Sequence, residues 1–362
     1  DKMSFPEQLT FSLGDRAKEK YDVEYTFDDG LQETADKLFR RYKPDYGAIF
    51  MMDAETGEVL VYSSYQRDSK VPVNLVKRST YPAASVFKII TASAAVDRAG
   101  VTPSHRIRFN GGNWTLYKRN VMKDRINRWT RTVTLKEAFA KSMNTAFGKL
   151  SLKELDPRDL KEYAERFLFN QYIPADFYSQ PGSATVPQEK NYHLTEVASG
   201  FNRKTQMGPV QGAMIAASII NNGEMVVPYM VQSLYKENGE QAYNGELVSR
   251  GEVIGAESAR TLQKLMSATV HKGTSRKSFR PLVRSKKYKH LKIGGKTGHL
   301  YGTEPKGTVD WFVGYAADDN RKIAISAVLV NKDYWYVKSS FLGQRLIRKA
   351  FSEPMQSVSS HP

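Results

Sequence analysis

The stretch Leu291-Lys-Ile-Gly-Gly-Lys-Thr-Gly-His-Leu300 is the part of the chain from which the architecture can be worked out. Its apolar spacing predicts a β-strand. Two further strand-like runs follow at 309–316 and 323–330, and a helical pattern at 339–351 comes after them. Successive strands followed by a helix indicate the C-terminal half of a sheet with one helix packed on it.

The N-terminal part of the chain shows the same kinds of pattern in the opposite order. Apolar residues at helical spacing over 31–42 come before two strand-like runs, 46–52 and 58–64, which a turn at 54–57 joins. Because strands lie at both ends of the chain, we expect one antiparallel sheet of about five strands. The predicted fold class is α/β of the α+β type, with the terminal helices on one face of the sheet.

The middle of the chain is expected to form a separate lobe. From residue 85 to about 271 the pattern is predominantly helical, with clear helix starts at Thr134-Leu-Lys-Glu137 and at Gly208-Pro209. The prediction is a large all-helical lobe, with an active site in the cleft between the lobe and the sheet edge. The predicted segments are a linker at 1–24, sheet halves at 25–84 and 272–352 around the lobe, and a tail at 353–362.

Composition narrows the classes of function. The 362 residues include no cysteine, which excludes disulfides and thiol catalysis, and the six histidines show no metal-ligand spacing, so we expect neither a metal site nor a cofactor. The formal net charge of +16 predicts attraction to polyanions such as nucleic acid, anionic lipid or acidic cell-wall polymers. No nucleic-acid-binding module accompanies the charge, so nucleic acid is not an expected partner.

Ser85-Val-Phe-Lys88 is the first candidate for chemistry. Three residues apart at the start of a helix, the hydroxyl and the amine face the same side and can share a proton. A serine becomes a strong nucleophile only when a neighbouring base removes its proton, and a lysine is a base only when burial or nearby positive charge lowers its pKa. The pattern alone is weak, because Ser233-Leu-Tyr-Lys236 repeats it in a strand-like run.

Two further motifs supply the context that the first motif lacks. Ser142-Met-Asn144 is the only S-x-N in the chain and follows the helix that starts at Thr134, while Lys296-Thr-Gly298 is the only K-T-G and lies on a predicted strand. The three motifs occur in the order S-x-x-K, S-x-N and K-T-G, which is unlike a chance arrangement. They define the candidate site.

Together these motifs resemble the transpeptidase domain of penicillin-binding proteins. The resemblance covers most of the chain. It is carried by segments that include Gly47–Val59, Pro82–Lys88, Leu135–Phe147, Met207–Gln211 and Asp310–Tyr315. It implies a serine acyl-transferase that acts on peptidoglycan stem peptides and binds β-lactams covalently.

The resemblance implies a role for each residue of the first two motifs. Ser85 would attack the penultimate D-Ala carbonyl of a stem peptide, and Lys88 would be its general base. Ser142 would relay a proton toward the leaving amine, and Asn144 would hold Lys88 and the substrate amide. These are the residues expected to carry out acylation.

The third motif is implied to bind the substrate. Lys296 and Thr297 would bind the terminal carboxylate, and Gly298 would let the strand come close to the substrate. The backbone N–H groups of His299 and Ser85 would form the oxyanion hole. His299 departs from the family pattern, which has a small hydroxyl residue there, and its side chain is interpreted as a strand histidine outside the catalytic set.

Three readings of the function stay open at this point. The first is a D,D-transpeptidase that cross-links the cell wall. The second is a hydrolase with the same acylation step, either a D,D-carboxypeptidase or a serine β-lactamase, and the third is a catalytically silent β-lactam sensor. The resemblance implies an extracytoplasmic domain anchored by a segment before Asp1, with stem peptides, β-lactams, anionic lipid or wall polymer, and cell-wall synthesis proteins as partners.

Overall fold

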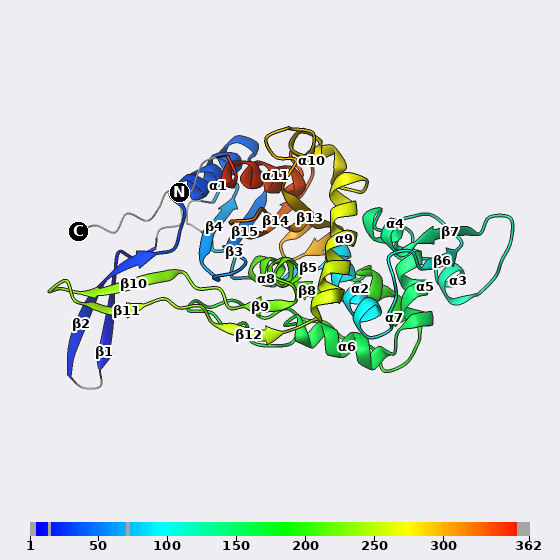
Figure 1. Cartoon of the computed structure of the whole chain (residues 1–362), viewed down its shortest axis with the longest axis horizontal. Coiled ribbons are helices and arrows are strands. Elements are labelled where there is room, and N and C mark those ends of the chain that lie inside the picture. The colour runs from blue at the N-terminus through cyan, green and yellow to red at the C-terminus, as the bar shows by residue number, and fades with distance from the viewer. Residues whose placement is uncertain (1–4, 14–15, 70–72, 353–362) are drawn as a thin grey trace.

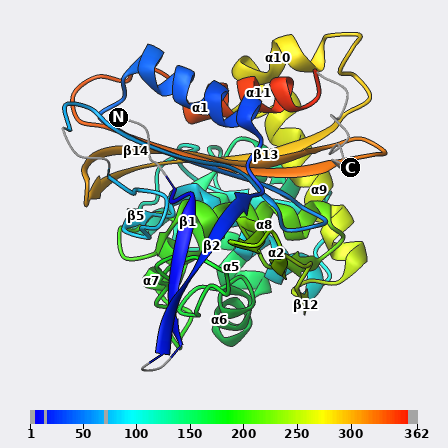
Figure 2. The same cartoon turned by 90° about the vertical axis from the view of Figure 1, so that its left-hand side faces the viewer.

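The computed structural model describes residues 5–13, 16–69 and 73–352. Its centre is a five-stranded antiparallel sheet with the order β13-β14-β15-β3-β4, seen edge-on in Figure 2. The strands are β3 (Tyr46–Asp53), β4 (Val59–Gln66), β13 (Lys292–Thr303), β14 (Lys306–Ala317) and β15 (Lys322–Asn331). The sheet joins the two ends of the chain, which confirms the prediction, and places β13 at an edge.

Helices from the two ends of the chain cover one face of this sheet (Figures 1 and 2). They are α1 (Asp29–Tyr42), α10 (Arg276–Val283) and α11 (Ser339–Ala350). Helix α1 forms because Leu31, Ala35 and Leu38 recur at helical spacing and are buried on one side. The Asp28 side chain accepts a hydrogen bond from the Leu31 N–H at 2.9 Å, so the start of the helix is capped.

The opposite face of the sheet packs on the lobe. Its helices are α2 (Lys88–Asp97), α3 (Lys118–Met122), α4 (Leu135–Ala140), α5 (Asn144–Glu154), α6 (Pro157–Arg166), α7 (Tyr192–Ser199), α8 (Pro209–Ile220) and α9 (Ala256–His271). All 12 residues of α8 are buried, because this helix lies between the sheet and the rest of the lobe. A helix that is apolar on every side is typical of such a central position.

The lobe is not all-helical, so that part of the prediction is wrong. It contains short antiparallel strand pairs, which are β5 (Tyr81–Pro82) with β8 (Gln206–Met207), β6 (Arg106–Phe109) with β7 (Arg131–Thr134), and β9 (Glu224–Val226) with β12 (Ser249–Glu252). Each of these strands has two to four residues. Runs of that length are too short to show a period-two pattern in the sequence.

The described residues of segment 1–24 form strands rather than the predicted linker. β1 (Gln8–Leu13) and β2 (Arg16–Tyr25) make a hairpin, and β2 pairs with β10 (Val231–Lys236), which pairs in turn with β11 (Gln241–Asn244). Figure 1 shows this second sheet projecting from the body of the molecule. Strand β2 gains its second partner, β10, from about 200 residues away, a pairing that no local pattern reveals. The predicted tail at 353–362 lies outside the described residues.

Candidate active site

Ser85 lies on a single turn of 3-10 helix, η1 (Ala84–Phe87), which continues directly into α2. The preceding Ala84 has φ of 48°, in the left-handed region. Gly200, with φ of 66°, packs so closely on this turn that an added Cβ would lie 1.8 Å from the Ala84 carbonyl oxygen. Because only glycine fits at position 200, the backbone there can hold the serine turn in place.

Lys88, one turn after Ser85, directs its amine at the serine hydroxyl. The Nζ atom lies 2.9 Å from Ser85 Oγ, 2.7 Å from Asn144 Oδ1 and 2.5 Å from the carbonyl oxygen of Ser199. A neutral amine has two N–H bonds and one lone pair. If the amide and carbonyl oxygens accept the two hydrogens, the lone pair points at the serine proton. The arrangement is therefore suited to a general base.

The surroundings of Lys88 favour its neutral form. The side chain is completely buried, and the ring of Phe147 lies 5.6 Å from Nζ. Burial lowers the pKa of Lys88 well below its ordinary value, and the positive charge of Lys296 lowers it further. Within the described part of the chain, no carboxylate forms an ion pair with Lys88, so no opposite charge offsets these two effects.

The S-x-N motif lies in the connection between α4 and α5. Helix α4 begins with the predicted capping box, in which Thr134 N donates to Glu137 Oε2 at 2.9 Å. After this helix ends, Ser142 adopts a left-handed φ of 56°, and Asn144 begins α5. The Asn144 Nδ2 group donates to the Trp114 carbonyl at 2.7 Å, which orients the amide so that its oxygen faces the buried lysine of α2.

Strand β13 places the side chain of Lys296 beside Ser142 of the S-x-N motif. Its Nζ donates to Ser142 Oγ and to the Thr297 carbonyl oxygen, each at 2.9 Å. The side chain is completely buried, and burial lowers the pKa of Lys296 to about 7. A substrate carboxylate bound here would supply the counter-charge that the described protein residues do not, and would favour the charged form of this lysine.

The rest of the K-T-G motif shapes the cleft. The hydroxyl oxygens of Thr297 and Thr274 lie 2.5 Å apart. At Gly298, an added Cβ would lie 3.1 Å from Val86 Cγ2 and 3.2 Å from the Ala83 carbonyl oxygen. The absence of a side chain therefore allows β13 to lie directly against the turn that carries the serine.

His299 follows the motif, and its side chain contacts Trp335. The imidazole stacks on Trp335 with ring centroids 4.6 Å apart and an interplanar angle of 9°. Desolvation lowers the pKa of His299, and the charge of Lys338 lowers it further. The backbone N–H of His299 stays a predicted part of the oxyanion hole.

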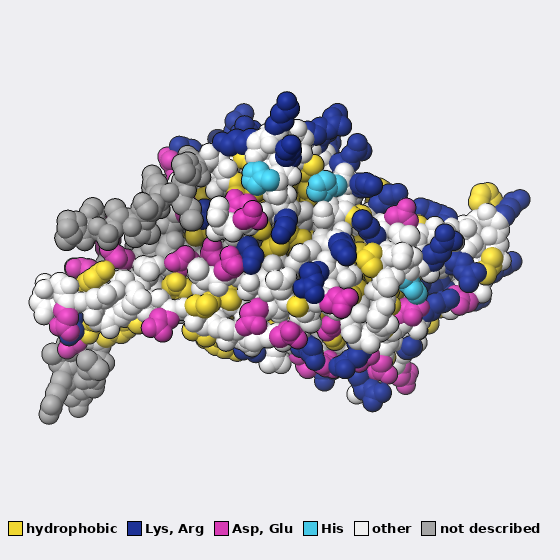
Figure 3. Space-filling view, in the orientation of Figure 1, with side chains coloured by type: hydrophobic (Ala, Val, Ile, Leu, Met, Phe, Trp, Pro, Cys, Tyr) yellow, Lys and Arg dark blue, Asp and Glu magenta, His cyan; other side chains and the backbone are white. Residues whose placement is uncertain are grey.

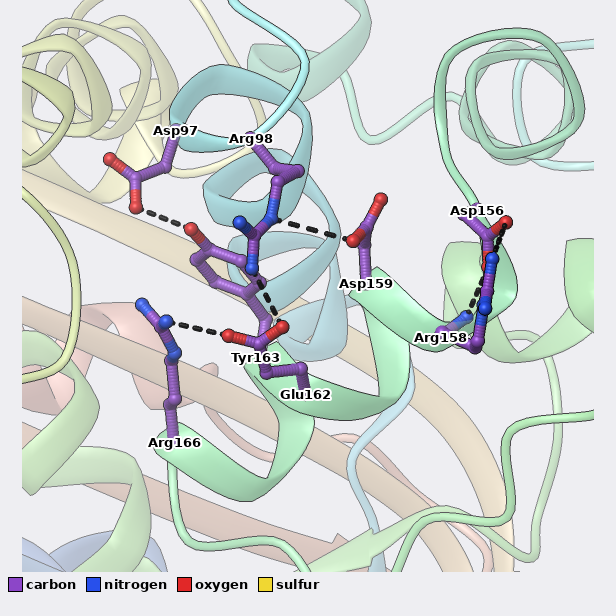
Figure 4. Close-up of polar contacts among 8 residues, drawn as sticks. All are labelled: Asp97, Arg98, Asp156, Arg158, Asp159, Glu162, Tyr163 and Arg166. Atoms are coloured by element: carbon purple, nitrogen blue, oxygen red, sulfur yellow. Dashed lines mark hydrogen bonds and ion pairs between the residues drawn. The ribbon is translucent and has the colours of Figure 1, made fainter.

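The far end of the helix that begins with Lys88 is held by polar contacts to α6 (Figure 4). Arg98 binds Glu162 with 2.7 Å between nitrogen and oxygen, and the Tyr163 hydroxyl donates to Asp97. Surface ion pairs of this kind contribute about 0–1 kcal/mol each. They join the C-terminal end of α2 to α6.

The predicted residues thus fall into two hydrogen-bonded groups. One joins Ser85, Lys88 and Asn144, and the other joins Ser142 and Lys296. Among the described contacts the Ser142 hydroxyl bonds to Lys296 and not to Lys88, a contact that the predicted relay role did not include.

Sequence reasoning missed four contributors to the site. They are the carbonyl oxygens of Ser199 and Trp114, the hydroxyl of Thr274 and the ring of Phe147. Carbonyl oxygens belong to every residue, so no motif could have signalled the first two. The other two lie in unremarkable local sequence and reach the site through the packing of α9 and α5.

A hydroxyl beside a buried amine, facing a second buried lysine, is an arrangement suited to serine acyl transfer. Residues 47–350 match the family described as the penicillin binding protein transpeptidase domain. The chain belongs to this family.

Similar curated proteins carry related names. The chain is 30% identical over 271 residues to the peptidoglycan D,D-transpeptidase PbpA of Mycolicibacterium smegmatis, an alignment that covers 71% of this chain and 51% of the relative. It is 23% identical over 338 residues to the stage V sporulation protein D of Bacillus subtilis, covering 87% and 50%. The chain therefore spans about half the length of the curated relatives it matches.

Solved structures share the fold. Penicillin-binding protein A of M. tuberculosis, as an imipenem acyl-enzyme, superposes with a TM-score of 0.73 at 21% identity, over 91% of this chain and 80% of that one. Penicillin-binding protein 3 of the same organism, complexed with aztreonam, gives 0.75 at 18% identity, over 95% and 82%. At such identities the likeness concerns the fold.

Proposed function

We propose that this chain is a peptidoglycan D,D-transpeptidase, which forms an acyl-enzyme on Ser85 with a stem peptide ending in D-Ala-D-Ala and then cross-links it to a second stem peptide. The observation that carries the proposal is the 2.9 Å contact between the buried Lys88 amine and Ser85 Oγ. Membership of the family and the names of the relatives support the same activity.

Acylation would proceed in two steps. Lys88 takes the proton of Ser85 as Oγ attacks the penultimate carbonyl, and the backbone N–H groups of Ser85 and His299 stabilise the oxyanion. The intermediate then collapses, the C–N bond to the last D-Ala breaks, and a proton passes from Lys88 to the leaving amine, with Ser142 as the proposed relay. Asn144 keeps the lysine aligned throughout.

Binding of the donor would depend on β13. Lys296 attracts the terminal carboxylate, and Thr297 donates its hydroxyl to it. In the free protein the pKa of Lys296 is about 7, so this lysine is charged only below that pH. Carboxylate binding is therefore favoured by lower pH, whereas the base function of Lys88 is favoured by higher pH. Gly298 lets the substrate backbone run beside the strand.

A labelled penicillin tests the first half of the reaction. We expect a covalent adduct by intact mass in the wild-type protein and none in Ser85→Ala. An adduct that survives Ser85→Ala would overturn the proposal. An adduct that is lost within minutes would point to a β-lactamase.

A stem-peptide assay separates the remaining alternatives. A cross-linked dimer as product supports transpeptidation, whereas a trimmed monomer identifies a D,D-carboxypeptidase. A protein that forms the β-lactam adduct but yields neither product from stem peptides would be a silent sensor.

The proposal includes an extracytoplasmic location, with an anchor contributed by sequence beyond this chain. No helix among the described residues has the length and apolar character needed to cross a bilayer. Proposed partners are stem peptides, β-lactams, anionic lipid or wall polymer, and other cell-wall synthesis proteins. No nucleic acid and no cofactor enter the proposed reaction.

A further inference from the structure

A groove of about 570 Å³ lies between α9 and the start of β13. Its floor includes the buried side chains of Leu291, Ile293 and Ala268. Among the residues that the structure describes, no acidic side chain lines it, but six basic ones do: Lys136, Arg260, Lys264, His271, Lys272 and Lys292. Figure 3 shows the face that carries α9, where Lys and Arg side chains crowd around exposed apolar atoms. We call this feature the α9 groove.

The cations of the α9 groove lack counter-charges. All five lysines and arginines are exposed, and none of them forms an ion pair within the residues that the structure describes. Elsewhere on the surface, by contrast, Lys322 pairs with Glu55 at 2.7 Å and Lys149 with Asp124 at 2.9 Å. Like charges around a concave surface produce a positive potential that attracts an anion.

The α9 groove adjoins the proposed carboxylate end of the active site. Alternate residues of a strand share a face, so Ile293 and Thr297 point to the same side of β13, about 13 Å apart along the strand. On the other wall, Lys272 comes two residues before Thr274, whose hydroxyl oxygen lies 2.5 Å from that of Thr297. A peptide that passes over these two threonines would enter the groove.

The chemistry of the second half-reaction determines the side from which the acceptor approaches the acyl-enzyme. Its amine must attack the Ser85 ester carbonyl from the side on which the first amine left, because aminolysis is the reverse of acylation. The new C–N bond forms as the C–Oγ bond breaks, and the proton of the amine passes through Lys88 to Ser85 Oγ. The departing D-Ala has its carboxylate at Lys296 and Thr297, so the acceptor arrives from the same end.

We propose that the α9 groove binds the acceptor stem peptide, recognised as a peptide with one free amine and several carboxylates. This inference rests on the proposed transpeptidase function. Arg260, Lys264 and Lys292 attract the carboxylates, and the apolar floor contacts the aliphatic parts of the peptide. A phosphate polymer would satisfy the cations but would leave the apolar floor without a partner, so the peptide is the better fit.

The test compares two triple variants that remove the same charge. R260Q/K264Q/K292Q removes three positive charges from the α9 groove, and R41Q/R345Q/R348Q removes three from a basic hollow of about 560 Å³ formed by α1, α11 and the segment before β13. The acceptor is a synthetic peptide with one amine and three carboxylates. We expect its KM to rise about tenfold in the groove variant alone, while the rate of acylation by penicillin stays at the wild-type value. The same peptide with amidated carboxylates should not distinguish the variants.

A binding measurement keeps this inference separate from the proposed activity. The fluorescent acceptor peptide is titrated into S85A, with and without the groove substitutions, and followed by anisotropy. If wild-type protein is never acylated, the proposed function fails, but the anisotropy still decides the groove. Equal binding by both forms, an equal loss in the control triple, or equally strong competition by inorganic polyphosphate would overturn the inference.

Discussion

Ser85 and Lys88 have the same spacing as Ser233 and Lys236, but the first pair lies on a helical turn and the second on strand β10. On the helical turn, the amine lies 2.9 Å from the serine oxygen. On the strand, Ser233 accepts instead from Gln241 at 3.0 Å, while the lysine binds a glutamate. Residues three apart face the same side of a helix but opposite sides of a strand, so only the first pair can share a proton.

The surroundings of the two lysines also shift their pKa values in opposite directions. Burial and Lys296 lower the pKa of Lys88, whereas the hydrogen bond to Glu240 raises the pKa of Lys236, whose side chain is 41% exposed. The comparison shows that the S-x-x-K pattern fixes the number of residues between the serine and the lysine, but neither the distance between their side chains nor the pKa of the lysine. The helix sets the distance between the amine and the hydroxyl, and burial lowers the pKa of the lysine; the proposed base needs both.

Substitution of Lys88 and of Lys236 should give the largest difference in acylation rate between the two S-x-x-K pairs. We expect Lys88→Met to lower the second-order rate of acylation by a fluorescent penicillin by about a hundredfold or more, because the serine loses its base. Lys236→Met is the matched control and should leave the rate unchanged. A minor effect of Lys88→Met would mean that another group accepts the serine proton.

The amide that aligns the active lysine is expected to matter less. Asn144→Ala removes the oxygen that lies 2.7 Å from Lys88 Nζ, and acylation should slow by about tenfold to thirtyfold. The control is Gln241→Ala, which removes the partner of Ser233 at the strand pair. Both variants are compared by stopped-flow acylation rates; equal rates for Asn144→Ala and wild type would contradict the assigned alignment.

The pH dependence of acylation should test the protonation states that the proposed reaction requires of Lys88 and Lys296. Acylation requires neutral Lys88, so the rate rises as the pH rises through the lowered pKa of Lys88. Carboxylate binding requires charged Lys296, so kcat/KM falls at a pH above the Lys296 pKa of about 7. Above that point we expect about a tenfold fall per pH unit. A donor whose carboxylate is a methyl ester should lack the alkaline fall. If ester and acid donors fall alike, Lys296 is not the carboxylate site.

The smallest effect is expected at the strand pair itself. Glu240→Gln removes the main cause of the raised pKa of Lys236, yet acylation should stay within about twofold and the free energy of unfolding within about 0.5 kcal/mol. Thermal unfolding and peptide mapping of the penicillin adduct measure both. A new adduct on Ser233 would show that charge state alone, without helical geometry, is sufficient.

Long elements with regular periodicity were predictable from the sequence. The helix at 31–42 and the strand containing 291–300 correspond to α1 and β13, since each buries a face along its length. The strands of segment 8–25 were missed because β2 is stabilised by pairing with β10. Strand formation of that kind depends on a distant partner and not on local spacing.

The candidate site, like the fold, was only partly predictable from the sequence. Motif order placed Ser85, Asn144 and Lys296 in one site before any geometry was known. It could not indicate that the Ser199 carbonyl completes the lysine environment, nor that Ser142 bonds to Lys296. These contacts depend on side-chain directions and on backbone oxygens, which have no signature in a sequence.

By itself, the sequence determined which residues could react and which elements would carry them, because helix and strand periodicity and residue chemistry are local properties. Tertiary structure decided which of two identical spacings holds a lysine of lowered pKa, because desolvation and neighbouring charge come from segments far apart in the chain. It also decided where the cations of the α9 groove gather, since Lys136, Arg260 and Lys292 meet around one groove only after folding.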